Sequence, residues 1–188
     1  NIYDLWATDG TGIEIFRTVM PLYRFKFLLQ CLRFDDKSTR EDRKKTDNLA
    51  PMREVFDKFV NNCKKSYSIS EYATVDEKLE AFRGRCHFRM FMPSNPSKYG
   101  IKMYALVDSR MFYTCNLEVY VGKQPDGPFK ISNNLCDVVE RLCEPIWSSG
   151  RNVTISNWFT GYELAMRMLK NHNLTVVGTL RKNKPEIP

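Results

Sequence analysis

The spacing of apolar residues changes near Tyr72, and this change limits the possible folds more than any other feature of the chain. Residues 73–82 have a β-like composition, and residues 98–108 alternate between apolar and polar positions. Residues 112–121 are rich in aromatic and β-branched side chains, which are typical of strands. The sequence therefore predicts three strands here, which we expect to form a meander.

The next part of the chain alternates between helices and strands. Residues 131–147 and 161–171 carry apolar side chains at helical spacing, so both are predicted helices. Residues 152–155 are a predicted strand, and residues 174–180 form the continuous apolar run typical of a buried parallel strand. The predicted order β-β-β-α-β-α-β is that of a ribonuclease H-like α/β fold, in which helical crossovers join a meander to parallel strands of a mixed sheet.

Residues 1–72 are predicted to be helical. One amphipathic helix follows Pro21 and another begins at Pro51, where proline suits the first helical turn. The linker at residues 35–48 is charged or polar with nearly balanced signs, so we expect a solvated loop. We accordingly divide the chain into a helical segment, residues 1–72, and an α/β core, residues 73–188, that is incomplete at its C-terminus.

Charge and cysteine content narrow the class of partner. The 188 residues carry a formal net charge of +7, which is compatible with a polyanion such as DNA but does not require one. The six cysteines include no C-x-x-C pair and there are only two histidines, so neither a zinc site nor a disulfide framework is predicted. No apolar run approaches the roughly 20 residues that span a bilayer, so we expect no membrane partner.

Five short motifs lie along the chain in one order: Leu32–Lys37, Val75–Arg85, Pro93–Lys102, Asn157–Thr160 and Val177–Lys184. Together they resemble the piggyBac transposase family, and the resemblance extends without large gaps from about Met20 to Pro188. It implies the ribonuclease H-like catalytic fold of that family and a longer protein on both sides. The helical segment would then be of a dimerisation or DNA-binding type.

The resemblance also implies where metal-binding carboxylates would stand. This fold cleaves DNA with two divalent ions, normally Mg²⁺, held by acidic side chains. The implied positions are Asp76, Ser156 and an aspartate beyond Pro188; active members have aspartate immediately before the Asn-Trp-Phe/Tyr-Thr run, where this chain has Ser156. A hydroxyl is neutral and a weak ligand, so we predict a degenerate site in which Asp76 is the only retained ligand. Asp76 then either keeps residual metal affinity or has become a structural residue, and Mg²⁺ is expected only if the site is active.

Two other acidic residues near these positions are not expected to replace the lost carboxylate. Glu77 follows Asp76 along a strand, and successive strand residues point to opposite faces. Asp108 stands near the end of the second predicted strand, where we expect it to stabilise a turn.

Basic residues cluster after the predicted strands, where DNA would pass across the carboxyl ends, and guanidinium groups suit phosphate. Arg83 and Arg85 flank Gly84, so they alternatively hold a turn against local carboxylates. Trp158 and Phe159 are expected to be core anchors rather than base-stacking groups. The predicted DNA-binding residues are Arg83, Arg85, Arg89, Lys98, Lys102, Arg181, Lys182 and Lys184.

These features lead to one functional hypothesis and two alternatives. The hypothesis is a domesticated piggyBac-derived protein of the nucleus that binds DNA or forms complexes and has lost strand cleavage. The first alternative is an active, magnesium-dependent cut-and-paste transposase acting at TTAA sites. The second is a structural subunit that partners an active homologue, since transposases of this family act as dimers. The expected partners are DNA and either a second copy or a related transposase.

Overall fold

The computed structural model describes residues 1–182, and the chain divides into two compact units, Asn1–Asp36 and Lys37–Pro188. The expected boundary at 72/73 does not coincide with this division, because the helix α5 (Arg53–Ser66) packs on strand β4 (Thr114–Val119) within the second unit. The functional roles expected for the two parts remain predictions. Among the described residues, no helix combines the length and apolar character needed to cross a membrane.

The first unit is built around Trp6. Its ring centroid lies 5.2 Å from that of Phe16 and 5.0 Å from that of Phe25, and its indole N–H donates to the carbonyl of Met20 at 2.8 Å. The helices of this unit are α1 (Ile2–Leu5), α2 (Glu14–Val19) and α3 (Leu22–Cys31). Helix α3 follows Pro21 as predicted, but none of its residues is fully buried, and Phe27, Leu28 and Leu29 are exposed.

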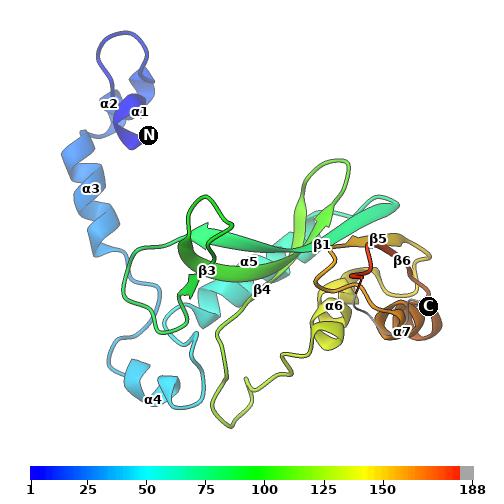
Figure 1. Ribbon diagram of the computed structural model, residues 1–188. Helices are drawn as coiled ribbons and strands as arrows, with labels where there is room; N and C mark the ends of the chain where they lie inside the picture. Colours follow the sequence, from blue (N-terminus) through cyan, green and yellow to red (C-terminus); the bar gives the residue numbers. More distant parts are fainter. Residues whose placement is uncertain (183–188) are drawn as a thin grey trace. The chain divides into compact units, whose positions relative to one another are not determined.

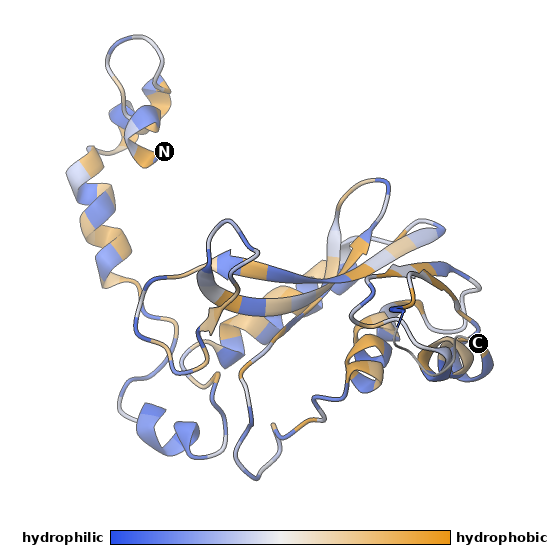
Figure 2. Cartoon of the chain, viewed as in Figure 1, coloured by the Kyte–Doolittle hydropathy of each residue, from blue (hydrophilic) through white to orange (hydrophobic). Residues whose placement is uncertain are grey.

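The linker at residues 35–48 is exposed over most of its length, as its composition predicts, but it is not a simple loop. It contains the short helix α4 (Arg40–Lys44), which is hydrophilic throughout (Figure 2), and it ends on a buried carboxylate. Asp47 is 2% exposed and accepts hydrogen bonds from the guanidinium of Arg53 at 2.8 and 2.9 Å and from the amide of Gln124 at 2.9 Å. Burying a charge requires such partners, and they tie the linker to α5 and to the chain after β4.

The second unit contains one six-stranded mixed sheet. The predicted meander is confirmed, because β3 pairs antiparallel with both β1 and β4, while β1, β5 and β6 run parallel. The short strand β2, which sequence periodicity did not indicate, pairs with the start of β3. The remaining strands are β1 (Tyr72–Ala81), β2 (Met90–Phe91), β3 (Tyr99–Asp108), β5 (Asn152–Ile155) and β6 (Thr175–Gly178).

Two helices provide the crossovers between the parallel strands and cover the same face of the sheet (Figure 1). Helix α6 (Leu135–Cys143) begins four residues later than the expected start at 131, because the side chain of Asn134 caps it by accepting from the amide of Cys136 at 2.9 Å. It continues as a 3₁₀ turn, Glu144–Ile146. Helix α7 (Tyr162–His172) ends at Asn173, whose left-handed φ of 51° suits a helix C-terminus.

The core lies between the sheet and these two helices. Burying aliphatic side chains of this size stabilises the fold by roughly 1.5–3 kcal/mol each. Alternation along β1 leaves Asp76 on the opposite, solvent-accessible face. The fully buried side chains of this core include Val75, Leu106, Val138, Val139, Leu142, Val153, Leu164 and Met168.

Candidate functional site

Asp76 and Ser156 are neighbours at the junction of two parallel strands. The register of β1 and β5 ends with Val75 opposite Ile155, so Asp76 and Ser156 are the next pair along the two strands. Both alternate with buried residues and therefore point to the same face, away from α6 and α7. The predicted adjacency of the two positions is confirmed by this register, while their functional roles remain predictions.

A tight turn fixes the position of Ser156. Its carbonyl accepts hydrogen bonds from the amides of Phe159 and Thr160, both at 3.1 Å, and from the hydroxyl of Thr160 at 2.8 Å. The turn fits against β6 only because residue 178 is glycine: a Cβ there would stand 2.2 Å from the hydroxyl oxygen of Thr160. The backbone thus presents residue 156 in a defined place, whatever its side chain.

Within residues 1–182, the acidic residue that follows Asp76 does not share its face, and Glu80, further along β1, pairs with Lys78 at 2.9 Å. Its carboxylate is exposed and accepts from the amide of Glu77 at 2.8 Å. Glu77 itself lies on the opposite face, where an oxygen of its carboxylate stands 2.6 Å from the ammonium of Lys102. The prediction that Glu77 does not replace the missing carboxylate therefore agrees with its orientation.

Asp108 is committed to a turn, as predicted. Its fully buried carboxylate accepts from the amides of Ser70, Met111 and Arg110 at 2.6, 2.9 and 2.8 Å, and from the hydroxyl of Tyr67 at 3.2 Å. The amides of Ser70 and Met111, followed by that of Arg110, hold the pKa of this carboxyl well below its usual range, because they stabilise the charged form. Its oxygens are engaged in the fold.

The donor set at the Asp76–Ser156 pair does not fit two magnesium ions. Mg²⁺ prefers carboxylate oxygens in octahedral geometry, and this pair supplies one carboxylate and one neutral hydroxyl. No group of three or more His, Cys, Asp or Glu side chains suited to a metal occurs within residues 1–182. Asp76 and Ser156 would therefore need further ligands from outside the described residues to hold such a pair of ions.

The basic residues predicted to bind DNA differ in their exposure and in their contacts. Arg83 and Arg85 are exposed in the loop after β1 and form no ion pair within the described residues, so the alternative that they hold a turn against carboxylates gains no support. Lys98 is exposed on the turn between β2 and β3. Arg89 has a structural contact: its guanidinium donates to the carbonyls of Arg83 and Gly84 at 3.2 and 3.1 Å.

The remaining predicted basic residues lie on β3 and after β6. Lys102 is buried and paired with Glu77, so its ammonium is not presented to a ligand. Arg181 and Lys182 are exposed after β6, and Lys184 lies outside the described residues. Alternation predicted neither the burial nor the pairing of Lys102, because its carboxylate partner comes from another strand.

The two aromatic residues after Ser156 have different roles. Phe159 is a core anchor, as predicted, with its ring 5.8 Å from that of Tyr104. The same prediction was wrong for Trp158, which is 45% exposed. Its indole lies beneath the guanidinium of Arg181, which stands 4.8 Å from the ring centroid. Nothing in local spacing indicated this contact, because the two residues meet only when β5 and β6 pair.

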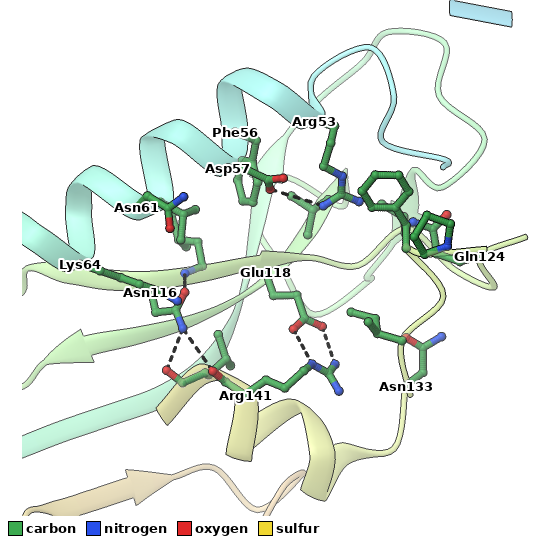
Figure 3. Close-up of a pocket in the computed structure, with 18 of the residues that line it drawn as sticks. Arg53, Phe56, Asp57, Asn61, Lys64, Asn116, Glu118, Gln124, Asn133 and Arg141 are labelled. Atoms are coloured by element: carbon green, nitrogen blue, oxygen red, sulfur yellow. Dashed lines mark hydrogen bonds and ion pairs between the residues drawn. The ribbon is translucent and has the colours of Figure 1, made fainter. Parts of the chain in front are cut away.

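A separate cavity of about 410 Å³ lies between α5, β4 and α6 (Figure 3). It contains none of the predicted site residues, and its main polar groups pair with one another. Arg141 forms a two-pronged ion pair with Glu118 at 2.8 and 3.1 Å, and Asn116 donates to the carbonyls of Arg141 and Leu142 at 3.3 and 2.9 Å (Figure 3). These contacts hold β4 to α6 and indicate a structural role.

The mixed sheet, in which the β1–β3–β4 meander adjoins the parallel strands β5 and β6, defines the ribonuclease H-like fold class. The family model described as Transposase IS4 matches residues 1–188. A solved structure of a piggyBac transposase synaptic complex with hairpin DNA is 39% identical, with a TM-score of 0.86, and covers 100% of this chain and 39% of that chain. The chain belongs to the IS4/piggyBac-type transposase family, and the predicted family and fold class are both confirmed. It spans 39% of the length of the solved transposase.

Proposed function

We propose that this chain is part of a nuclear DNA-binding protein, descended from a transposase and retained by its host, that does not cleave DNA. The observation that carries the proposal is Ser156, which takes the place beside Asp76 where two carboxylates would have to converge. The turn at residues 156–160 fixes the backbone of Ser156 through its carbonyl, which supports a loss of charge without a loss of architecture.

The missing charge prevents catalytic metal binding. Two divalent ions about 3.5–4 Å apart repel each other strongly, and carboxylates near both ions offset that repulsion. A serine hydroxyl contributes no negative charge, and Glu77 and Asp108 are held elsewhere by Lys102 and by backbone amides. Mg²⁺-dependent activation of an attacking oxygen is therefore not supported at this site.

DNA binding is supported by exposed cations near the same end of the sheet. Arg83, Arg85 and Lys98 are solvent-accessible and have no carboxylate partner within residues 1–182, so they can neutralise phosphates. The solved relative is a transposase complex with hairpin DNA, which favours DNA as the ligand here. We leave Lys102 out of this surface because it is buried with Glu77.

We further propose that the protein acts as a homodimer or together with a related transposase. The surface of the first unit supports this proposal, since Phe27, Leu28, Leu29 and Leu32 of the α3 region are exposed. Exposed apolar side chains of this number are suited to burial against another protein.

The test compares metal binding and DNA cleavage between the wild type and variants at residue 156. Ser156→Asp restores a carboxylate. Ser156→Asn introduces a side chain with nearly the shape of aspartate but no charge. We expect no cleavage of TTAA-flanked DNA by the wild type, and tighter Mg²⁺ binding by Ser156→Asp but not by Ser156→Asn, measured by calorimetry.

Three outcomes would contradict the proposal. Magnesium-dependent nicking by the unmodified protein, abolished by Asp76→Ala, would establish the active transposase instead. Cleavage that appears only after an active homologue is added would establish the structural-subunit role. Absence of DNA binding at low salt would remove the DNA-binding function altogether.

A further inference from the structure

Trp158 and Arg181 form an exposed stack at the edge of the sheet. The guanidinium carbon of Arg181 lies 4.8 Å from the centroid of the Trp158 ring, and 45% of Trp158 is accessible to solvent. The two residues come from the segments directly after β5 and β6. Trp158 is two positions beyond Ser156, so the stack adjoins the junction that carries Asp76 and Ser156.

The indole is held in place from the protein side. The ammonium of Lys102 lies 5.6 Å from the Trp158 centroid and 5.2 Å from that of Tyr104, and Glu77 neutralises it at 2.6 Å. Phe159, the next residue, is anchored in the core. The position of Trp158 is therefore largely preorganised, which reduces the entropy lost when a ligand binds.

The two cations near Trp158 differ in exposure and in pairing. Lys102 is buried and its charge is offset by Glu77, whereas Arg181 is exposed and has no carboxylate partner within residues 1–182. The outward side of the stack therefore presents an indole and a planar cation together. This combination suits a ligand that has both an aromatic face and a negative charge nearby.

We propose that Trp158 and Arg181 form a stacking site for an unpaired nucleobase at a DNA end or in an opened duplex. The inference rests on the proposed DNA-binding function and adds to it the class of DNA that this edge selects. Aromatic side chains and guanidinium planes stack on the faces of bases, and these faces are accessible only when the base has left the helical stack. A fully paired duplex offers phosphates to Arg181 but no base to Trp158.

The test uses two DNA duplexes of equal phosphate number, one blunt and one with four unpaired nucleotides at one end. An unpaired 2-aminopurine reports stacking through fluorescence quenching, and anisotropy reports affinity. We expect the wild type to quench the probe and to prefer the duplex with the unpaired end. Trp158→Ala should lose about 5- to 140-fold in affinity for that duplex, which corresponds to 1–3 kcal/mol per stacked base. Its affinity for the blunt duplex should change little.

Three variants act as controls. Trp158→Phe should keep most of the preference, because phenylalanine also stacks. Trp147→Ala removes another half-exposed tryptophan, 42% accessible and stacked on His172, and should leave the preference unchanged. Arg181→Lys keeps the charge but loses the planar group, so it should lower the preference and spare blunt-duplex binding.

The outcomes separate the two proposals. A wild type that binds both duplexes equally, or binds without quenching the probe, overturns the stacking site and leaves the proposed function intact. Equal losses on both duplexes in Trp158→Ala also overturn it, since that result indicates a structural role. A wild type that binds neither duplex refutes the proposed function itself. If Trp158→Ala fails to fold, Arg181→Lys decides the question, because an unchanged preference for the unpaired end in that variant overturns the stacking site.

Discussion

Removing the exposed positive charges from the loop after β1 and from the turn between β2 and β3 should make the DNA affinity less dependent on salt concentration. The perturbation is the triple variant Arg83→Gln, Arg85→Gln and Lys98→Gln. All three side chains are exposed and lack ion pairs within the described residues, so their removal should leave the core unchanged. Each is expected to contact one phosphate and to release its counterions.

The magnitude follows from counterion release. A slope of about −0.9 in log K against log salt for each neutralised phosphate gives about −2.7 for three contacts. Between 50 and 200 mM salt, these contacts alone account for a loss of about 40-fold in the affinity of the wild type. The triple variant should therefore show a slope that is less negative by about 2.7, together with weaker binding to every duplex sequence.

The assay is fluorescence anisotropy with one blunt duplex across a series of salt concentrations. A matched control removes the same net charge elsewhere, through Lys45→Gln, Lys58→Gln and Lys130→Gln. These lysines are exposed but pair locally with Asp42, Glu54 and Asp126. If both triple variants change the slope equally, the net charge of the protein and not this surface governs DNA binding. An unchanged slope in the variant of Arg83, Arg85 and Lys98 refutes the assignment of these residues to the DNA-binding surface.

Two further substitutions test how the second unit is held together. Asp47→Asn should lower the free energy of unfolding, measured by urea denaturation, by about 2–3 kcal/mol, because it leaves the partly buried Arg53 with only its longer ion pair to Asp57 at 3.5 Å. Burial raises the pKa of Asp47, but hydrogen bonds from Arg53 and Gln124 outweigh it and lower that pKa overall. The stability that the Asp47 carboxylate contributes should thus be complete above the unfolded pKa near 3.9 and lost as the pH falls through the lower folded pKa. A difference in unfolding free energy between the wild type and Asp47→Asn that does not shrink at acid pH would contradict this prediction. Gly178→Ala should lower the melting temperature through about 1–3 kcal/mol of overpacking, since its Cβ would lie 2.2 Å from the hydroxyl oxygen of Thr160, and an unchanged melting temperature would show that the turn yields freely.

The order of strands and helices in the core could be predicted from the sequence. Strands β1, β3 and β5 were located to within about a residue, because alternation and apolar runs are local consequences of which face is buried. The adjacency of Asp76 and Ser156 followed once that order indicated parallel neighbours. The role of Asp108 also followed from its place at the end of a strand.

Predictions failed where a side chain finds its partner far along the chain. The charged linker appeared solvated, yet Asp47 is buried by contacts with Arg53 and with Gln124, which is 77 positions away. The late start of α6 has a local cause instead: Asn134 caps the helix, and the apolar spacing that begins at residue 131 did not show it. The division at 72/73 stays a prediction about function, while α5 packs on β4 within the second compact unit.

The sequence by itself determined the family and the order of the core elements, since these depend on residue identity and local periodicity. Only the tertiary structure decided that Lys102 is buried against Glu77 while Arg181 stacks outward on Trp158. Both are basic residues on or after a strand, and no local pattern distinguishes them. Their environments differ because sheet pairing brings a carboxylate to one ammonium and an exposed indole to the other cation, and pairing between strands distant in sequence is a property of the whole fold.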